Sequence, residues 1–227
     1  MPTVALPLVY SFLSSKESAQ YGAALQAVRS FAATFGIANC KPQRIMTDFE
    51  LAILNACSDT FVDEEVVLSC CFFHLSQNIY RHVQSEGLQQ AYNAEDDTVR
   101  TQIHMLAALA FVPVDHVLAT FAIYKAQIPP VIEPVVKYFD ETYVSGRRAQ
   151  GRRRAVLPRY AIPIWNQYQS TVDGEARTNN VSEGWHNRFR LLVAKHHPDI
   201  FSACRELQKE QGATEISIVE LGLGKKN

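Results

Sequence analysis

The chain has 227 residues, 47% hydrophobic and 20% charged, a composition typical of a globular protein with one large domain or a core carrying an inserted subdomain. The formal net charge of −1 excludes a strong overall positive field, so a nucleic-acid partner must be held by a local basic patch. The five cysteines are odd in number and lie mostly in apolar runs, which favours reduced, buried thiols over a disulfide framework. No apolar run has the length of a membrane span, and no secretory signal opens the sequence, so we expect a cytosolic or nuclear protein.

The first third of the sequence alternates between strand and helix patterns. In chain order we expect a strand over residues 4–13, a helix over 18–35, a strand over 44–47, a helix through 51–57 and a strand, buried on both faces, over 66–73. Gly36 suits the end of the first helix, and Thr47 with Glu50 forms a capping-box pattern before the second. This alternation predicts an α/β fold with parallel strands and crossover helices.

The rest of the sequence has a helical pattern. Four segments are expected, starting near residue 75 and covering 97–111, 114–124 and 131–144, with breaks at Pro113 and at Pro129 and Pro130. A basic loop and a proline-rich stretch follow, then a helix carrying Glu183 and a last helix over 198–211. We therefore divide the chain into an α/β part (1–74), a helical insertion (75–165) and C-terminal helices that return to the first part (166–227).

The helix expected after Arg177 has two distinct faces. Thr178, Asn179 or Asn180 can cap its first amides. Helical spacing places Val181, Trp185, Phe189 and Leu192 on one face. The opposite face receives Glu183, His186, Asn187 and Arg190. Such a polar face is either solvated or part of a site.

Two acids suggest a metal site. Asp48 follows a predicted strand, and Glu183 lies on the distant polar face; their hard oxygen ligands suit Mg²⁺ or Mn²⁺. Two such ions can activate an attacking oxygen and stabilise a leaving one in phosphoryl transfer. The alternative for Asp48 is an acid that favours a helix start.

Cys71 and His74 have a spacing found in zinc sites, but a closed zinc site needs four ligands. His82, His186, His196 and His197 are possible further ligands, and nothing in the sequence selects among them. The alternative is a buried cysteine beside a hydrogen-bonded histidine.

A basic loop follows the helical insertion. Its arginines are Arg147, Arg148, Arg152, Arg153 and Arg154. Such a cluster can contact DNA phosphates or act as a nuclear address, and it can equally be a solvated connector.

Five segments taken in order resemble the catalytic domain of Mutator-like element (MULE) transposases. They are residues 7–10, 45–50, 71–74, 106–113 and 177–189. The resemblance implies a ribonuclease-H-like core with a helical insertion before the last catalytic helix, and DNA transposition by strand cleavage and transfer through an Asp-Asp-Glu triad that holds two divalent metals. Asp48 matches the second acid and Glu183 the third, and Cys71 with His74 matches the family's Cys-x-x-His element. His186 and Asn187 would flank the site.

The resemblance also implies a missing part. In the family the first Asp lies on a strand upstream of the segment resembling residues 4–13, so we expect an N-terminally truncated core that lacks its first strands and is inactive or incomplete. Residues 4–13 would then pair with the 44–47 strand or remain an edge. The implied partner is DNA at transposon ends, the implied location is the nucleus, and an oligomer is compatible with the sequence.

Two other interpretations stay open. A non-catalytic DNA- or protein-binding module could keep the fold without the reaction. An unrelated α/β interaction domain could place Asp48 merely at a helix start. The separation of Asp48 and Glu183 distinguishes this last interpretation from the others.

Overall fold

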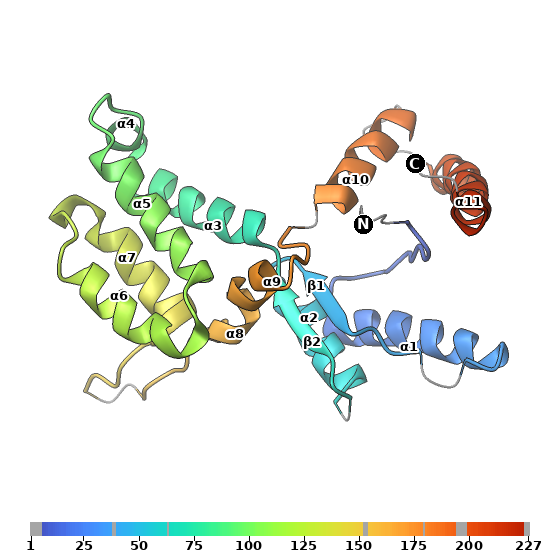
Figure 1. Cartoon of the computed structure of the whole chain (residues 1–227), viewed down its shortest axis with the longest axis horizontal. Coiled ribbons are helices and arrows are strands. Elements are labelled where there is room, and N and C mark those ends of the chain that lie inside the picture. The colour runs from blue at the N-terminus through green and yellow to red at the C-terminus, as the bar shows by residue number, and fades with distance from the viewer. Residues whose placement is uncertain are drawn as a thin grey trace.

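The computed structural model of the chain describes residues 6–37, 40–62, 64–151, 154–178, 180–193 and 199–224. It is rich in helix, with one small parallel sheet near its centre, an arrangement compatible with an α/β fold (Figure 1). Within the described part of the chain, no helix combines the length and the apolar character that a membrane crossing requires.

The sheet consists of β1 (Arg44–Thr47) and β2 (Val67–Cys70), which pair in parallel with Arg44 opposite Val67 and Thr47 opposite Cys70. The crossover between them contains α2 (Leu51–Thr60), and α1 (Ser18–Thr34) packs along α2. Both helices and the β1 strand were predicted at nearly these bounds. Gly36 follows α1 with a φ of 75°, as a glycine that ends a helix does.

A helical region follows β2 and holds most of the buried core (Figure 1). Its helices are α3 (Phe72–Ser85), α4 (Gln89–Tyr92), α5 (Thr98–Ala108), α6 (Val117–Lys125) and α7 (Glu133–Phe139), with short turns at Leu109–Phe111, Val114–His116, Pro130–Ile132 and Asp140–Val144. Apolar side chains from several of these helices are fully buried, among them Leu75, Val83, Leu106, Val136 and Phe139. The helical prediction for residues 75–145 is confirmed.

The chain returns to the sheet through α8 (Ile162–Trp165) and α9 (Tyr168–Val172). Trp165 is completely buried, and its indole N–H donates to the Tyr143 carbonyl at 2.9 Å. Gln167 is also completely buried; its side-chain amide donates to the Cys70 carbonyl at 2.8 Å and its backbone N–H to the Ala110 carbonyl at 2.6 Å. These bonds fix the end of β2 to the helical region.

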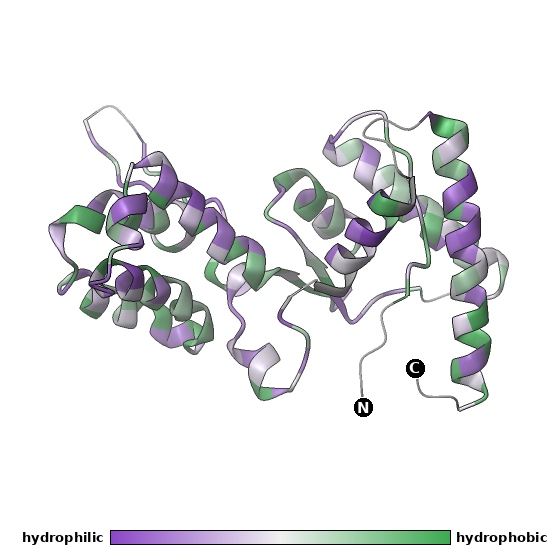
Figure 2. Ribbon diagram, turned by 90° about the horizontal axis from the view of Figure 1, so that it is seen from above, coloured by the Kyte–Doolittle hydropathy of each residue, from purple (hydrophilic) through white to green (hydrophobic). Residues whose placement is uncertain are grey.

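Two helices end the described chain, α10 (Asn180–Val193) and α11 (Ile200–Gly222). Figure 2 shows α11 as a long helix at the edge of the molecule, with hydrophilic and hydrophobic residues along its length. It is longer than the predicted 198–211 helix. Asp199 caps it by accepting from the Ser202 backbone N–H at 2.9 Å, and Gly212 lies within the helix instead of ending it.

The predicted strand over residues 4–13 is wrong over the residues that the structure describes, since residues 6–13 form no strand. In the described chain, the sheet comprises β1 and β2 alone, so no ladder satisfies the backbone of this segment. The segment packs against α10 instead, with the rings of Tyr10 and Trp185 5.5 Å apart.

Two further local predictions are wrong. No capping box opens α2: the Thr47 hydroxyl donates to the Asp48 carbonyl at 2.9 Å, and the Glu50 carboxylate accepts from the Tyr21 hydroxyl at 2.8 Å. The apolar run over 66–73 is only partly strand, because Phe72 already starts α3. It is not buried on both faces either, since Val67 is 52% exposed.

Replacing Trp165 by alanine should lower the free energy of unfolding by about 3–5 kcal/mol, because the change leaves a large cavity and an unpaired Tyr143 carbonyl. Urea unfolding followed by circular dichroism measures this. Tyr168→Ala, which truncates a 37% exposed ring nearby, is the control and should cost much less. Equal losses would show that Trp165 does not anchor the return of the chain.

Candidate functional site

The carboxyl ends of the two parallel strands bring distant residues together. The Cys71 N–H donates to the Thr47 carbonyl at 2.9 Å, and the Cys70 thiol donates to the Asp48 carbonyl at 3.4 Å. Asp48, which directly follows β1, is exposed. The residue after Cys71, Phe72, donates its N–H to the Arg177 carbonyl at 3.0 Å, which satisfies an amide at the start of α3. The segment leading into α10 therefore runs past the end of β2.

Glu183 reaches the first turn of α3. Its Oε1 lies 3.2 Å from Nε2 of His74, and the two side chains are 31% and 23% exposed. The N-terminal turn of a helix favours a carboxylate, because its amides carry a partial positive charge. The second ring nitrogen of His74, Nδ1, is buried and has no hydrogen-bond partner among the described residues. The contact connects the predicted third acid to the segment that contains Asp48, Cys71 and His74.

The surroundings of Asp48 keep the neighbouring thiol and phenol protonated. Burial, assisted by the negative charge of Asp48, raises the pKa of Cys70 to about 12. Burial and the hydrogen bond to Glu50 raise the pKa of Tyr21 to about 12, and Asp48 acts in the same direction. Cys70 is also completely buried and its thiol donates to the Asp48 carbonyl, so it packs at the end of the sheet.

The side chains near the carboxyl ends of the strands that could bind a metal are mainly oxygen donors. Asp48 and Glu183 carry the hard oxygens that Mg²⁺ and Mn²⁺ prefer. Among the residues that the structure describes, however, no group of three or more histidine, cysteine or acidic side chains could hold an ion. Asp48 and Glu183 are therefore suitable ligands for Mg²⁺ or Mn²⁺, but the described residues do not supply a third protein ligand.

A zinc site on Cys71 and His74 gains no support from the same residues. Cys71 is completely buried, and His74 faces Glu183. His82, one of the possible completing ligands, stacks on Tyr138 with ring centres 4.0 Å apart and contacts Glu86 at 3.4 Å. His196 and His197 lie outside the described residues.

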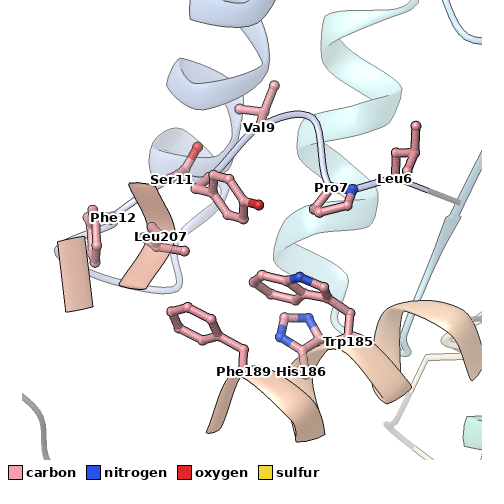
Figure 3. A pocket seen from close by; sticks show the side chains of 10 residues that line it. Leu6, Pro7, Val9, Ser11, Phe12, Trp185, His186, Phe189 and Leu207 are labelled. Atoms are coloured by element: carbon pink, nitrogen blue, oxygen red, sulfur yellow. The ribbon is translucent and has the colours of Figure 1, made fainter. Parts of the chain in front are cut away.

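The apolar face of α10 lines a hollow of about 460 Å³ under residues 6–12 (Figure 3). Trp185 and Phe189 stack with ring centres 5.0 Å apart, and Leu207 of α11 closes one side. His186 also lines this hollow, although the sequence placed it on the polar face with Glu183. Asn187 and Arg190 are exposed. The side chains of Val181 and Leu192 lie outside the described part of the chain, as does all of Asn179.

A buried carboxylate between α10 and α11 was not predicted from the sequence. Glu210 is 5% exposed and accepts from the Trp185 indole N–H at 2.8 Å and from the Arg188 guanidinium. Such pairing is what allows a carboxylate to be buried. The signal was the spacing of Trp185 and Arg188, three apart on one helix, but nothing identified Glu210 as their partner.

The arginine loop forms the end of a hairpin. Arg147 and Val156 exchange two backbone hydrogen bonds of 2.8 Å each. Gly146 is required before this bridge, because its φ is 74° and a Cβ there would lie 2.1 Å from the Val156 carbonyl oxygen. The described residues of the loop lie below the helical region, away from α10 (Figure 1).

Three of the loop arginines are described, Arg147, Arg148 and Arg154. All three are exposed, and no ion pair within the described residues involves them. They line a hollow of about 950 Å³ together with Lys125, Lys137 and the acids Asp140 and Glu141. Arg152 and Arg153 lie outside the described residues.

Part of the chain matches the sequence model of a known protein family. Residues 3–78 match the sequence model of the MULE transposase domain. The match includes Asp48, Cys71 and His74 and ends well before Glu183. No curated protein and no solved structure is similar enough to count as a match. Over these residues, about a third of its length, the chain is similar to a MULE transposase domain.

Proposed function

We propose that this chain is a transposase-like protein whose Asp48 and Glu183 are the second and third acids of a ribonuclease-H-like active site. The observation that carries the proposal is the 3.2 Å contact between His74 and Glu183, because it connects α10 to the segment that matches the family. The helical region between them would be the insertion that precedes the last catalytic helix.

The chemistry follows from the family and from the ligand types. Transposases of this kind depend on divalent metals, which activate the attacking oxygen and stabilise the leaving one. Asp48 and Glu183 would supply carboxylate oxygens, and His74 would orient the Glu183 carboxylate through Nε2. Water and DNA phosphates commonly complete the coordination of Mg²⁺, so two protein ligands give weak binding when DNA is absent.

The metal assignment is tested with Mn²⁺, whose binding is followed by the relaxation of water protons. We expect wild-type protein to bind Mn²⁺, and Asp48→Asn or Glu183→Gln to weaken binding about tenfold or more, since each removes a charged ligand. Asp59→Asn, a change of an exposed acid on α2, is the matched control and should leave binding unchanged. Equal binding by all four proteins would remove the metal site from this edge.

We expect the chain alone to show no cleavage of DNA in Mg²⁺ or Mn²⁺. The described residues form no group of three ligands, and positioned metals supply much of the barrier lowering in phosphoryl transfer. The measurement is nicking of supercoiled plasmid over a range of metal concentrations. Nicking that the wild type performs and Glu183→Gln loses would contradict this expectation and would mean that another residue supplies the missing ligand.

We also propose that DNA is the partner and the nucleus the location, with the arginine loop as a phosphate contact. The support is the exposure of Arg147, Arg148 and Arg154 in a hollow where these arginines and Lys137 outnumber the acids, since Asp140 is already paired with Lys125 at 2.6 Å and Glu141 is the other acid that lines it. Contacts to phosphates fix position without reading sequence, so binding should show no base preference.

Changing Arg147, Arg148 and Arg154 together to alanine should flatten the plot of log affinity against log salt for duplex DNA. Each lost phosphate contact lowers the slope by about 0.9, hence by up to about 2.7 for three. Fluorescence anisotropy at several salt concentrations measures the slope. A triple variant of exposed cations elsewhere, Lys41, Arg81 and Arg205 to alanine, removes the same charge and should keep the slope. If both triple variants behave alike, the loop is a connector.

A further inference from the structure

An aromatic groove lies between α3 and α5, with a volume of about 520 Å³. Its floor is aliphatic, formed by Ile79, Ile103 and Ala107. Ring side chains form much of the rest, namely Phe72, Phe73, Tyr80, Tyr92, His104 and Phe111. No acidic side chain is among the described residues that line it. A groove of this composition suits a flat, electron-rich or neutral ring better than a charged group.

The rings support one another and leave Phe73 accessible. Phe72 and Phe111 meet edge to face with centres 4.8 Å apart, and Tyr80 and Tyr92 lie 5.1 Å apart. Tyr92 also bonds to His104, with 2.9 Å between the hydroxyl and Nε2. Phe73 is 42% exposed at the groove. It therefore presents an aromatic surface on a rigid helix.

Positive charge borders one end of the groove. The Arg177 guanidinium lies 5.8 Å from the centre of the Phe111 ring, and this arginine is exposed. It lines a smaller hollow of about 440 Å³ that shares Phe72 and Phe111 with the groove. The nearby Glu175 is paired with Arg44 at 2.6 Å, so its charge is compensated. Aromatic rings beside a cation are the arrangement that binds unpaired nucleic-acid strands.

We propose that this groove binds unpaired bases of a DNA strand, which stack on Phe73 and its neighbours while Arg177 contacts the phosphates. The inference rests on the proposed function for the identity of the nucleic acid, and it adds the state of the substrate, a strand with bases out of the duplex. Its position supports it: Phe72 and Phe73 immediately precede His74, which contacts Glu183. A strand in the groove would thus lead directly to the candidate site.

The test distinguishes binding through the bases from binding through the phosphates. Anisotropy measures the affinity of the full chain, in EDTA, for a single-stranded oligonucleotide and for the same strand with abasic sites, which keeps every phosphate. We expect the intact strand to bind about fivefold or more tightly, since one stacked base contributes about 1 kcal/mol or more. Phe73→Ala should bring the intact strand to the abasic affinity, and Phe73→Trp should preserve the difference.

Two controls make the result decisive. Met105→Ala removes a 48% exposed apolar side chain of α5 that does not line the groove, and it should keep the preference for the intact strand. Because EDTA removes metal, loss of Mn²⁺ binding in the earlier test would leave this inference standing. Equal wild-type affinity for intact and abasic strands would overturn it. So would an apolar fluorescent probe that occupies the groove and is not displaced by the oligonucleotide, which would mark a protein-docking surface.

Discussion

The candidate site depends on the exit of the chain from β2. Two consecutive residues donate their backbone N–H groups to different partners: Cys71 bonds to Thr47 at the end of β1, and Phe72 bonds to Arg177 before α10. His74, two residues further on, contacts Glu183. Each bond is ordinary in strength, about 1 kcal/mol. Their effect is on position. The residues that lead into α3 and form its first turn contact both the end of β1, which Asp48 follows, and the segment and helix that carry Arg177 and Glu183.

The sequence predicted the elements whose signals are local. The β1 strand and the extent of α1 follow from apolar periodicity and from Gly36. Glu183 was predicted as a site residue from its place in a motif, which the sequence shows directly. Its contact with His74 could not be read in this way, because the bond depends on how the helical region returns the chain to the sheet. The same holds for Glu210, whose partners lie on another helix.

The wrong predictions share a physical cause. Residues 6–13 have the composition of a strand, but a strand needs a neighbour to pair with, and these residues cover the aromatic face of α10 instead. The Glu50 carboxylate, expected to cap α2, is held by the Tyr21 hydroxyl of α1. In both cases a tertiary contact replaced the local one. His186 shows a similar effect, since packing beside Trp185 brings it into the hollow under residues 6–12.

The long excursion of the chain between Phe72 and Arg177 has a modest thermodynamic cost. Closing a loop costs more as it lengthens, but each doubling adds only about 0.6 kcal/mol. The helical region compensates with a buried core centred on Phe139, Tyr143 and Trp165, and this core continues into Cys70 of β2 and Leu54 of α2. It can then carry the arginine loop at one end and the aromatic groove beside the sheet. Asp48 remains at the end of β1 and Glu183 on α10, while the helical region carries the arginine loop and the groove that we propose as contacts for DNA.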